Sequence, residues 1–210
     1  MRTDSRDREQ KLFEVADGQG GYFTAQQARP IGYYNRLQHY HKEKGDWLHI
    51  ERGIYRLRNY PNSEREDLIR WSLWSFNRKG EPQITFSHQT ALAFHELGDF
   101  MPAKLHVTVP PAFRKMIPGG CVVHRAVLLP EDVKSISCFK VTTPLRSLFD
   151  SYAADAEPDQ LERAIVDALT RGMVRLDQIQ QPGPSNQMEK FLAYVREIRN
   201  RSAHKSNAHA

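Results

Sequence analysis

The chain has 210 residues, of which 40% are hydrophobic and 26% are charged, a composition that supports a buried core and excludes an intrinsically disordered chain. No apolar run approaches the roughly 20 residues that span a bilayer. The charged first residues are not followed by the apolar stretch of a secretory signal, so we expect a cytoplasmic protein without membrane association.

The net charge of +5 is unevenly distributed along the chain. Residues 1–62 carry 11 lysines and arginines against 8 acids, residues 63–181 carry 14 against 15, and residues 182–210 carry 5 against 2. A polyanionic partner is therefore expected to contact the two ends of the chain rather than the middle. The two cysteines, Cys121 and Cys138, form no CxxC pair, and we expect both to be reduced, buried thiols.

Two short helical patterns come first. A helix is predicted from about residue 5 to residue 17 and ends at a glycine-rich turn, residues 18–21. After a short extended piece, Thr24 and Gln27 have the spacing of a capping box, in which each side chain binds the other residue's backbone amide. This pair predicts a second helix over residues 25–29 that ends near Pro30.

A third helix and a hairpin complete the N-terminal pattern. The helix is predicted over residues 33–44 and ends at Gly45. Two β-prone runs, residues 47–50 and 53–57, follow it with a short turn between them. The order of helix, short helix, turn, helix and hairpin is typical of a winged helix-turn-helix, which we assign to residues 5–60 as a DNA-binding domain.

The middle of the chain predicts a mixed α/β domain over residues 63–181, which makes the expected fold class α+β. Ser63 and Glu66 form a second capping-box pattern. Helices are expected over residues 64–77, 88–97, 144–150 and 158–171, and strands over residues 84–86, 105–109, 121–127 and 139–142, with a last short turn at 176–180. Residues 182–210 are interpreted as a linker, a short amphipathic helix and a flexible tail from about residue 201.

The third helix carries the candidate residues for reading DNA. Leu37 is its clear core position, with Tyr33 and Tyr40 able to flank it. The other side chains donate to phosphates or read base edges, as asparagine or glutamine does with adenine and arginine with guanine. The candidates for base readout are Tyr34, Asn35, Gln38 and His39, those for the DNA backbone are Arg36, Lys42 and Lys44, and Gln26 of the second helix is a further DNA-binding candidate.

The hairpin adds a run of positive charge. Arg52, Arg56 and Arg58 place three guanidinium groups on seven residues with no acid among them. A wing that lies along a phosphate backbone needs such charge, because each neutralised phosphate releases counterions. The prediction depends on these arginines and the polar side chains of the third helix sharing one exposed face. The alternative is that these residues have no binding role. The helix would then be an ordinary amphipathic surface helix, and the arginines would keep an edge hairpin soluble.

Several short motifs resemble one family of regulators. In residues 10–60 they are Tyr22-Phe23-Thr24-Ala25-Gln26-Gln27-Ala28, Leu37, and Arg52-Gly53-Ile54-Tyr55-Arg56-Leu57. In the middle domain they are residues 87–93, Leu97-Gly98, residues 105–110 and residues 141–150. In this order they resemble the AbiEi-type antitoxins of type IV toxin–antitoxin systems, over about 170 of the 210 residues.

The resemblance implies a repressor that binds repeats in the promoter of its own operon and neutralises a nucleotidyltransferase-like toxin. In that family the antitoxin opposes the toxin without necessarily forming a stable complex. The first domain is then expected to bind double-stranded DNA, and the second to be required for antitoxin activity.

No motif predicts catalysis. His95-Glu96 starts like the zinc-protease helix HExxH, but Asp99 stands where the second histidine belongs. His88, His106 and His124 are far apart in sequence and could converge in space, although such histidines are more often capping, surface or core groups. We therefore expect no catalytic residue, no metal site and no cofactor. Two alternatives stay open: a solitary winged-helix regulator whose α/β domain senses a ligand, and an α/β enzyme with an appended winged helix.

Overall fold

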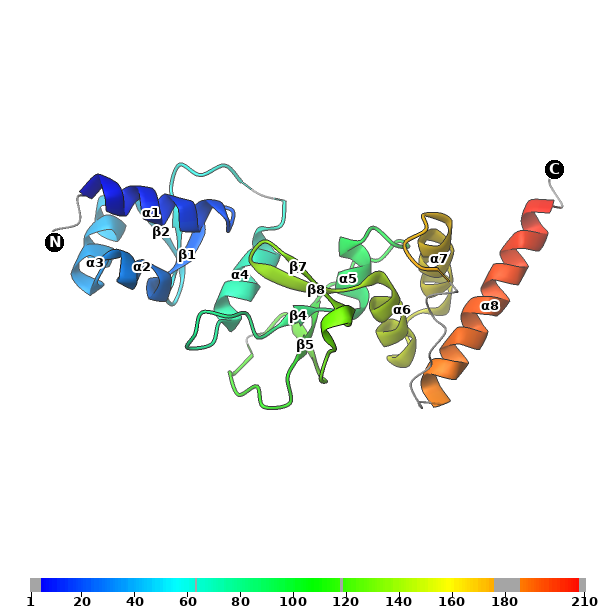
Figure 1. The fold of residues 1–210 in the computed structure, drawn as a ribbon. Helices are drawn as coiled ribbons and strands as arrows, with labels where there is room; N and C mark the ends of the chain where they lie inside the picture. Colours follow the sequence, from blue (N-terminus) through cyan, green and yellow to red (C-terminus); the bar gives the residue numbers. More distant parts are fainter. Residues whose placement is uncertain (1–4, 63, 118, 176–185, 208–210) are drawn as a thin grey trace. The chain divides into compact units, whose positions relative to one another are not determined.

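The computed structural model describes residues 5–62, 64–117, 119–175 and 186–207 (Figure 1). The fold is α+β, with helices and two β-sheets. The chain divides into two compact units. Unit 1 comprises the chain up to Ile84 together with Ser135–Lys140, and unit 2 comprises Thr85–Lys134 and the chain from Val141 onward.

Unit 1 contains helices and strands where the sequence predicts them. In chain order they are α1 (Ser5–Asp17), β1 (Tyr22–Thr24), α2 (Ala25–Ile31), α3 (Asn35–Lys44), β2 (Trp47–Glu51), β3 (Ile54–Leu57) and α4 (Glu66–Ser75). The capping box at the start of α2 is confirmed: the Thr24 hydroxyl accepts the Gln27 amide at 3.1 Å, and the Gln27 side chain accepts the Thr24 amide at 2.9 Å. Helix α2 passes Pro30 and ends at Ile31.

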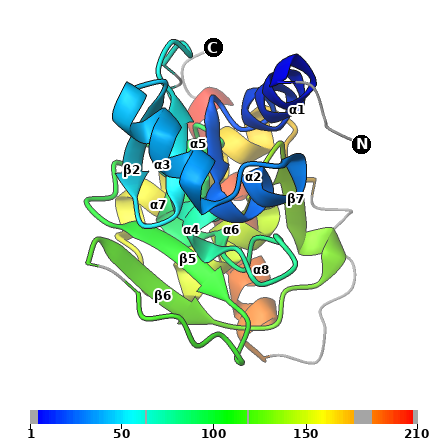
Figure 2. The same cartoon turned by 90° about the vertical axis from the view of Figure 1, so that its left-hand side faces the viewer.

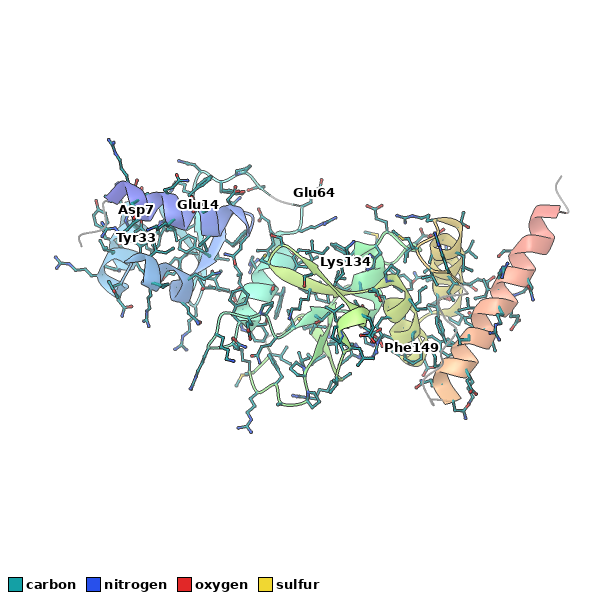
Figure 3. All side chains as sticks on the ribbon, viewed as in Figure 1. Asp7, Glu14, Tyr33, Glu64, Lys134 and Phe149 are labelled. Atoms are coloured by element: carbon teal, nitrogen blue, oxygen red, sulfur yellow. The ribbon has the colours of Figure 1, made fainter. Side chains whose placement is uncertain are left out.

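The three strands of unit 1 form an antiparallel sheet in the order β1-β3-β2. Neighbouring side chains of a strand point to opposite faces. Phe23 and Tyr55, which are paired across the sheet, face the core formed with Leu12, Ala16 and Trp47 from the surrounding elements. In Figure 3, Asp7 and Glu14 lie on α1, and Tyr33, a member of the same core, precedes α3.

The opposite face of this sheet is covered by α4. Tyr22 and Arg56, the next pair across β1 and β3, contact Glu66 at the start of α4. The Tyr22 hydroxyl donates to Glu66 at 2.9 Å, and burial together with this hydrogen bond raises the pKa of Tyr22 to about 12. Helix α4 is thus part of unit 1, and the predicted boundary at residues 60–63 lies inside this unit. The predicted Ser63 cap lies outside the described residues.

Unit 2 combines most of a mixed sheet with four helices. Its elements begin with β4 (Thr85–Phe86), α5 (His88–Phe94), β5 (Leu105–Val109), β6 (Cys121–Arg125) and the 3-10 turn η1 (Pro130–Asp132). They continue with β7 (Val133–Ile136), β8 (Phe139–Thr142), α6 (Pro144–Ala153), α7 (Pro158–Thr170) and α8 (Asn186–Asn207). Strand β7, which the sequence pattern did not predict, forms a hairpin with β8, and Ser135–Lys140, which include the last two residues of β7 and the first two of β8, belong to unit 1.

The strand order of the second sheet is β6-β5-β4-β8-β7. Strands β5 and β6 lie side by side and parallel, as Figure 2 shows, with His106 opposite Val122 and Thr108 opposite His124. Strand β4 pairs antiparallel with β5 and parallel with β8. Thr108 and His124 are paired and therefore point to the same face of the sheet. His106 is two residues from Thr108 on β5, so it points to this face as well.

The helices of unit 2 share one apolar core, to which α5, α6, α7 and α8 contribute. Phe191, Val195 and Ile198 of α8 are almost fully buried in it. Helix α8 is not short, as the sequence suggested, but runs over 22 residues to Asn207 and includes most of the expected flexible tail. The predicted turn at 176–180 and the predicted linker at 182–185 lie outside the described residues. In the described part of the chain, no helix is both long and apolar enough to cross a membrane.

Candidate nucleic-acid interface

Helix α3 presents a polar outer face. Tyr34 takes the N-cap position with an extended backbone, and Gly45 ends the helix in the left-handed region with φ +81°. Tyr33 is buried against Trp47, with ring centroids 5.0 Å apart. Tyr40, expected to flank the core, is instead exposed, and its ring lies 5.9 Å from the Lys44 ammonium group.

Six of the predicted α3 residues lie at the surface of unit 1. Tyr34, the N-cap residue of α3, is 68% exposed. The exposed candidates are Tyr34, Asn35, Arg36, His39, Lys42 and Lys44. Their side chains are accessible to a partner, as an interface requires.

Gln38 is not a base-reading residue, and its assignment is wrong. The side chain is only 6% exposed, and its amide nitrogen donates to the Tyr33 carbonyl at 2.7 Å and to the Ala25 carbonyl at 3.2 Å. Ala25 is the first residue of α2, and Tyr33 directly precedes the N-cap residue of α3. Gln38 therefore joins α3 to the start of α2. Its polar amide group is needed for these two hydrogen bonds inside unit 1.

The hairpin offers one fully available arginine. Arg52 occupies the turn between β2 and β3, is exposed, and has no hydrogen bond or ion pair among the described residues. Arg58 is also exposed, but its guanidinium donates to the carbonyl oxygen of Gly45 at the end of α3. Arg58 thus connects the base of the hairpin to the last turn of α3.

Arg56 is buried, which corrects the prediction that it contacts DNA. It is 7% exposed, and its Nη2 atom lies within 3.0 Å of oxygen atoms of Tyr60, Pro61 and Asn62. Its ion pair with Glu66 has an N···O distance of 3.4 Å. Since β3 is the central strand, alternate side chains face either the helical core or α4, and Arg56 faces α4.

Part of the positive charge on α3 is balanced locally. Lys44 lies 3.3 Å from Asp46, whose hydrogen bond raises the pKa of the lysine. Lys42 lies 3.7 Å from Glu43, and His39 lies 4.0 Å from the same carboxylate. Arg36, like Arg52, has no such partner in the described part of the chain. Arg36 of α3 and Arg52 of the hairpin turn are therefore the candidate cations most available to a phosphate.

Two exposed residues of α2 have different contacts, and only Arg29 contacts an α3 candidate. Arg29, which was not among the predicted residues, is exposed and donates from Nη2 to the Asn35 side-chain oxygen at 3.2 Å. Its position next to Pro30, in a helix of seven residues, gave no periodic signal. Gln26 is also exposed, but its amide nitrogen donates to the Arg78 carbonyl at 2.6 Å and is held there.

The fold has a counterpart among solved structures. The chain is similar to the crystal structure of the RV2827C protein from Mycobacterium tuberculosis. The match has a TM-score of 0.52 and 12% sequence identity, and it covers 94% of this chain and 78% of that chain. At this identity the likeness shows the fold alone. No protein-family model matches the chain, and no curated protein matches it.

Unit 2 brings three distant histidines together. The rings of His88 and His124 are stacked, with centroids 3.5 Å apart and an interplanar angle of 15°. The Nδ1 atom of His106 lies 3.2 Å from Nε2 of His124, and Nδ1 of His88 lies 2.9 Å from the Ser87 hydroxyl. Burial and the neighbouring imidazoles lower the pKa of His88 to about 3. No group of three or more histidines, cysteines or acids in the described residues could hold a metal ion.

The other residues weighed for catalysis have structural contacts. His95 is buried and its Nε2 atom lies 2.8 Å from the Thr142 carbonyl. Arg146 joins Asp150 at 2.8 Å, the expected i, i+4 pair, and Asp132 at 3.0 Å. Burial raises the pKa of Asp150 to about 6, against the opposing charge of Arg146. Arg146 and Asp150 both lie on α6, the helix on which Figure 3 labels Phe149.

Proposed function

We propose that the chain is a DNA-binding transcriptional autorepressor, the antitoxin of a type IV toxin–antitoxin pair, and that residues 5–60 form its winged helix-turn-helix. Helix α3 is the recognition helix and the β2–β3 hairpin is the wing. The order of helices and strands in unit 1, with the hairpin directly after α3 and β3 in the centre of the sheet, supports this assignment.

The observation that carries the DNA-binding proposal is the exposed face of α3. It combines cations with groups that can read base edges, above all Arg36, Asn35 and His39. A recognition helix needs this combination because phosphate contacts fix its register and base contacts supply its specificity. Arg52 at the hairpin turn adds a free guanidinium that can neutralise a phosphate.

The antitoxin role is supported by the sequence resemblance to AbiEi-type antitoxins. The partner implied by that resemblance is a nucleotidyltransferase-like toxin, which the chain opposes with or without a stable complex. The proposal assigns DNA binding to unit 1 and the antitoxin activity to unit 2.

DNA binding is tested with the segment upstream of the protein's own reading frame, at several salt concentrations. We expect specific binding that weakens with salt, and we expect Arg36→Ala and Arg52→Ala each to reduce the slope of log K against log salt by about one unit. Arg114→Ala is the matched control, because it removes an exposed arginine from unit 2, in the middle of the chain where positive charge is not in excess. Equal slopes in all four proteins would contradict the assignment of α3 and the hairpin.

The antitoxin role is tested by co-expression. A nucleotidyltransferase-like reading frame adjacent to the gene is expected to arrest growth alone, and the full chain is expected to restore growth. A variant with Arg36 and Arg52 replaced by alanine should lose repression of the promoter and still restore growth when expressed from another promoter. Failure of the wild-type chain to restore growth would leave a regulator without this antitoxin role.

A further inference from the structure

We propose that Arg29 and Asn35 form a composite reader that selects guanine in the major groove. This inference rests on the proposed DNA-binding function and deepens it, because it names the base and adds Arg29 as a specificity-determining residue. The observation behind it is the hydrogen bond from Arg29 Nη2 to Asn35 Oδ1, 3.2 Å long, which joins the end of α2 to the start of α3.

The hydrogen bond fixes which end of the asparagine amide faces outward. A guanidinium group has five N–H donors and no acceptor, so the atom of Asn35 that faces Arg29 must be the oxygen. The Nδ2 atom, with its two donors, is then left to face a partner. Arg29 and Asn35 are both exposed, so neither is occupied by the core of unit 1.

A free asparagine has a different preference. Asparagine reads adenine with both ends of its amide: the oxygen accepts from the adenine N6 amino group while the nitrogen donates to N7. This bidentate contact needs the oxygen turned toward the base, whereas Arg29 holds the oxygen toward α2. The adenine preference expected for Asn35 alone is thus opposed by its neighbour.

The remaining groups of the pair are donors only. Asn35 offers its Nδ2 hydrogens, and Arg29 offers the guanidinium hydrogens that its bond to Asn35 does not use. In the major groove, guanine presents two adjacent acceptors, N7 and O6, whereas adenine presents an acceptor beside a donor, cytosine presents a donor, and thymine presents a single acceptor beside a methyl group. Guanine is therefore the base whose edge offers one acceptor to each of the two donor side chains.

The experiment is selection of bound sequences from a random DNA library, with the full chain and with variants. The sequences selected by the wild type are compared with those selected by Asn35→Ala. The base position at which this variant loses its preference is the position that the pair reads. At this position we expect the wild type to prefer guanine over adenine about tenfold or more. Replacing that guanine by 7-deazaguanine, which lacks the N7 acceptor, should weaken binding.

Arg29→Met is the decisive variant. It removes the donor that holds the Asn35 oxygen, so Asn35 becomes free to read adenine, and the preference at this position should move from guanine to adenine. Arg29→Lys is the matched control, because it keeps a donor and the charge and should keep guanine. Both residues are exposed, and circular dichroism verifies that the variants are folded.

Three results would overturn the inference. The wild type could prefer a base other than guanine at the Asn35 position, or Arg29→Met could leave the guanine preference intact. Arg29→Met could also weaken all sequences equally, which would place Arg29 on a phosphate. Absence of any DNA binding by the wild type would instead refute the proposed function, and the inference would fall with it.

Discussion

The Arg56 guanidinium group lies among oxygen atoms of residues 60–62 and Glu66, inside unit 1. Burying a charge is costly unless it is paired and hydrogen-bonded. Here three oxygen atoms lie within 3.0 Å of Nη2, and two of them are the backbone carbonyls of Tyr60 and Pro61. Arg56 thus fixes the chain segment that leads from β3 to α4.

Arg56→Ala is expected to destabilise the protein by about 3 kcal/mol, because it removes the cation paired with the Glu66 carboxylate and the donor that these carbonyls share. Urea unfolding followed by tryptophan fluorescence measures the loss. Arg52→Ala, on the exposed turn of the same hairpin, should change stability by less than about 0.5 kcal/mol. If both variants were equally stable, the buried network would not contribute as the geometry implies.

The histidine cluster of unit 2 gives a second prediction at the scale of residues. Burial lowers the pKa of His88, His106 and His124 below the usual 6.5, and the facing imidazoles add to the shift in His88 and His124. As pH falls below about 6.5, the unfolded chain therefore takes up protons before the folded chain does, and stability is lost. For His88 this window extends down to about pH 3.

His124→Phe keeps a ring against His88 and removes one titrating group. The free energy of unfolding of the wild type should fall more steeply between pH 7 and pH 5 than that of this variant. Asp150 acts in the opposite direction, because its pKa is raised to about 6 in the folded chain, but it is present in both proteins and cancels in the comparison. Parallel pH profiles would show that the cluster titrates normally.

At the scale of elements, the turn between α1 and β1 depends on Gly21. Its φ is +86°, its amide donates to the Ala16 carbonyl at 2.8 Å, and its carbonyl accepts the Leu57 amide at 2.9 Å. A side chain there would overlap the Tyr60 ring. The position thus combines a left-handed backbone with close approach of an aromatic side chain.

Gly21→Ala and Gly53→Ala separate these two effects. Gly53 has φ +76° and open space around it. Gly53→Ala should therefore cost only the free energy of holding an alanine in the left-handed backbone region, about 1 kcal/mol. Gly21→Ala should cost about 1–3 kcal/mol more, because Tyr60 must move. Thermal unfolding of the two variants beside the wild type measures the difference, and an equal loss would mean that Tyr60 adapts freely.

Local signals predicted most elements but not what covers them. The Thr24–Gln27 box, the glycines that end helices, and the alternation in residues 105–109 each depend on neighbours in sequence, and each gave the right element. The role of Arg56 depends on α4, and the role of Gln38 depends on carbonyls of Tyr33 and Ala25. A polar residue on a predicted helix or strand therefore reads as exposed until its tertiary contacts are known.

The dependence on tertiary contacts also explains which residues of the candidate interface could be predicted. Charge and helical spacing identified Asn35, Arg36 and Arg52, which the structure leaves exposed. Spacing could not identify Arg29, because its bond to Asn35 joins two helices through the turn at Gly32. At this scale, sequence gives the surface of a helix, while the pairing of side chains between helices needs the structure.

For the whole molecule, the apolar cores of the two units involve different residues. The core of unit 1 includes Leu12, Phe23 and Trp47, and the core of unit 2 includes Leu148, Ile165 and Phe191. All three tryptophans, at positions 47, 71 and 74, lie in unit 1. Tryptophan fluorescence therefore reports on unit 1, whereas far-ultraviolet circular dichroism reports on the helices of both units.

Phe191→Ala tests whether the two units unfold separately, because fluorescence follows unit 1 and dichroism follows both units. Phe191 of α8 is fully buried, with its ring centroid 5.7 Å from that of Phe149 and 5.4 Å from that of Tyr152. Its truncation should destabilise unit 2 by about 3–5 kcal/mol, and the exposed Arg199→Ala on the same helix should cost less than about 0.5 kcal/mol. Phe191→Ala should lower the urea midpoint of the dichroism signal and leave that of the fluorescence signal in place, because no tryptophan packs in the core that it damages. A fluorescence midpoint that falls by the same amount would mean that the two units unfold as one, and that the DNA-binding surface proposed for unit 1 depends on α8.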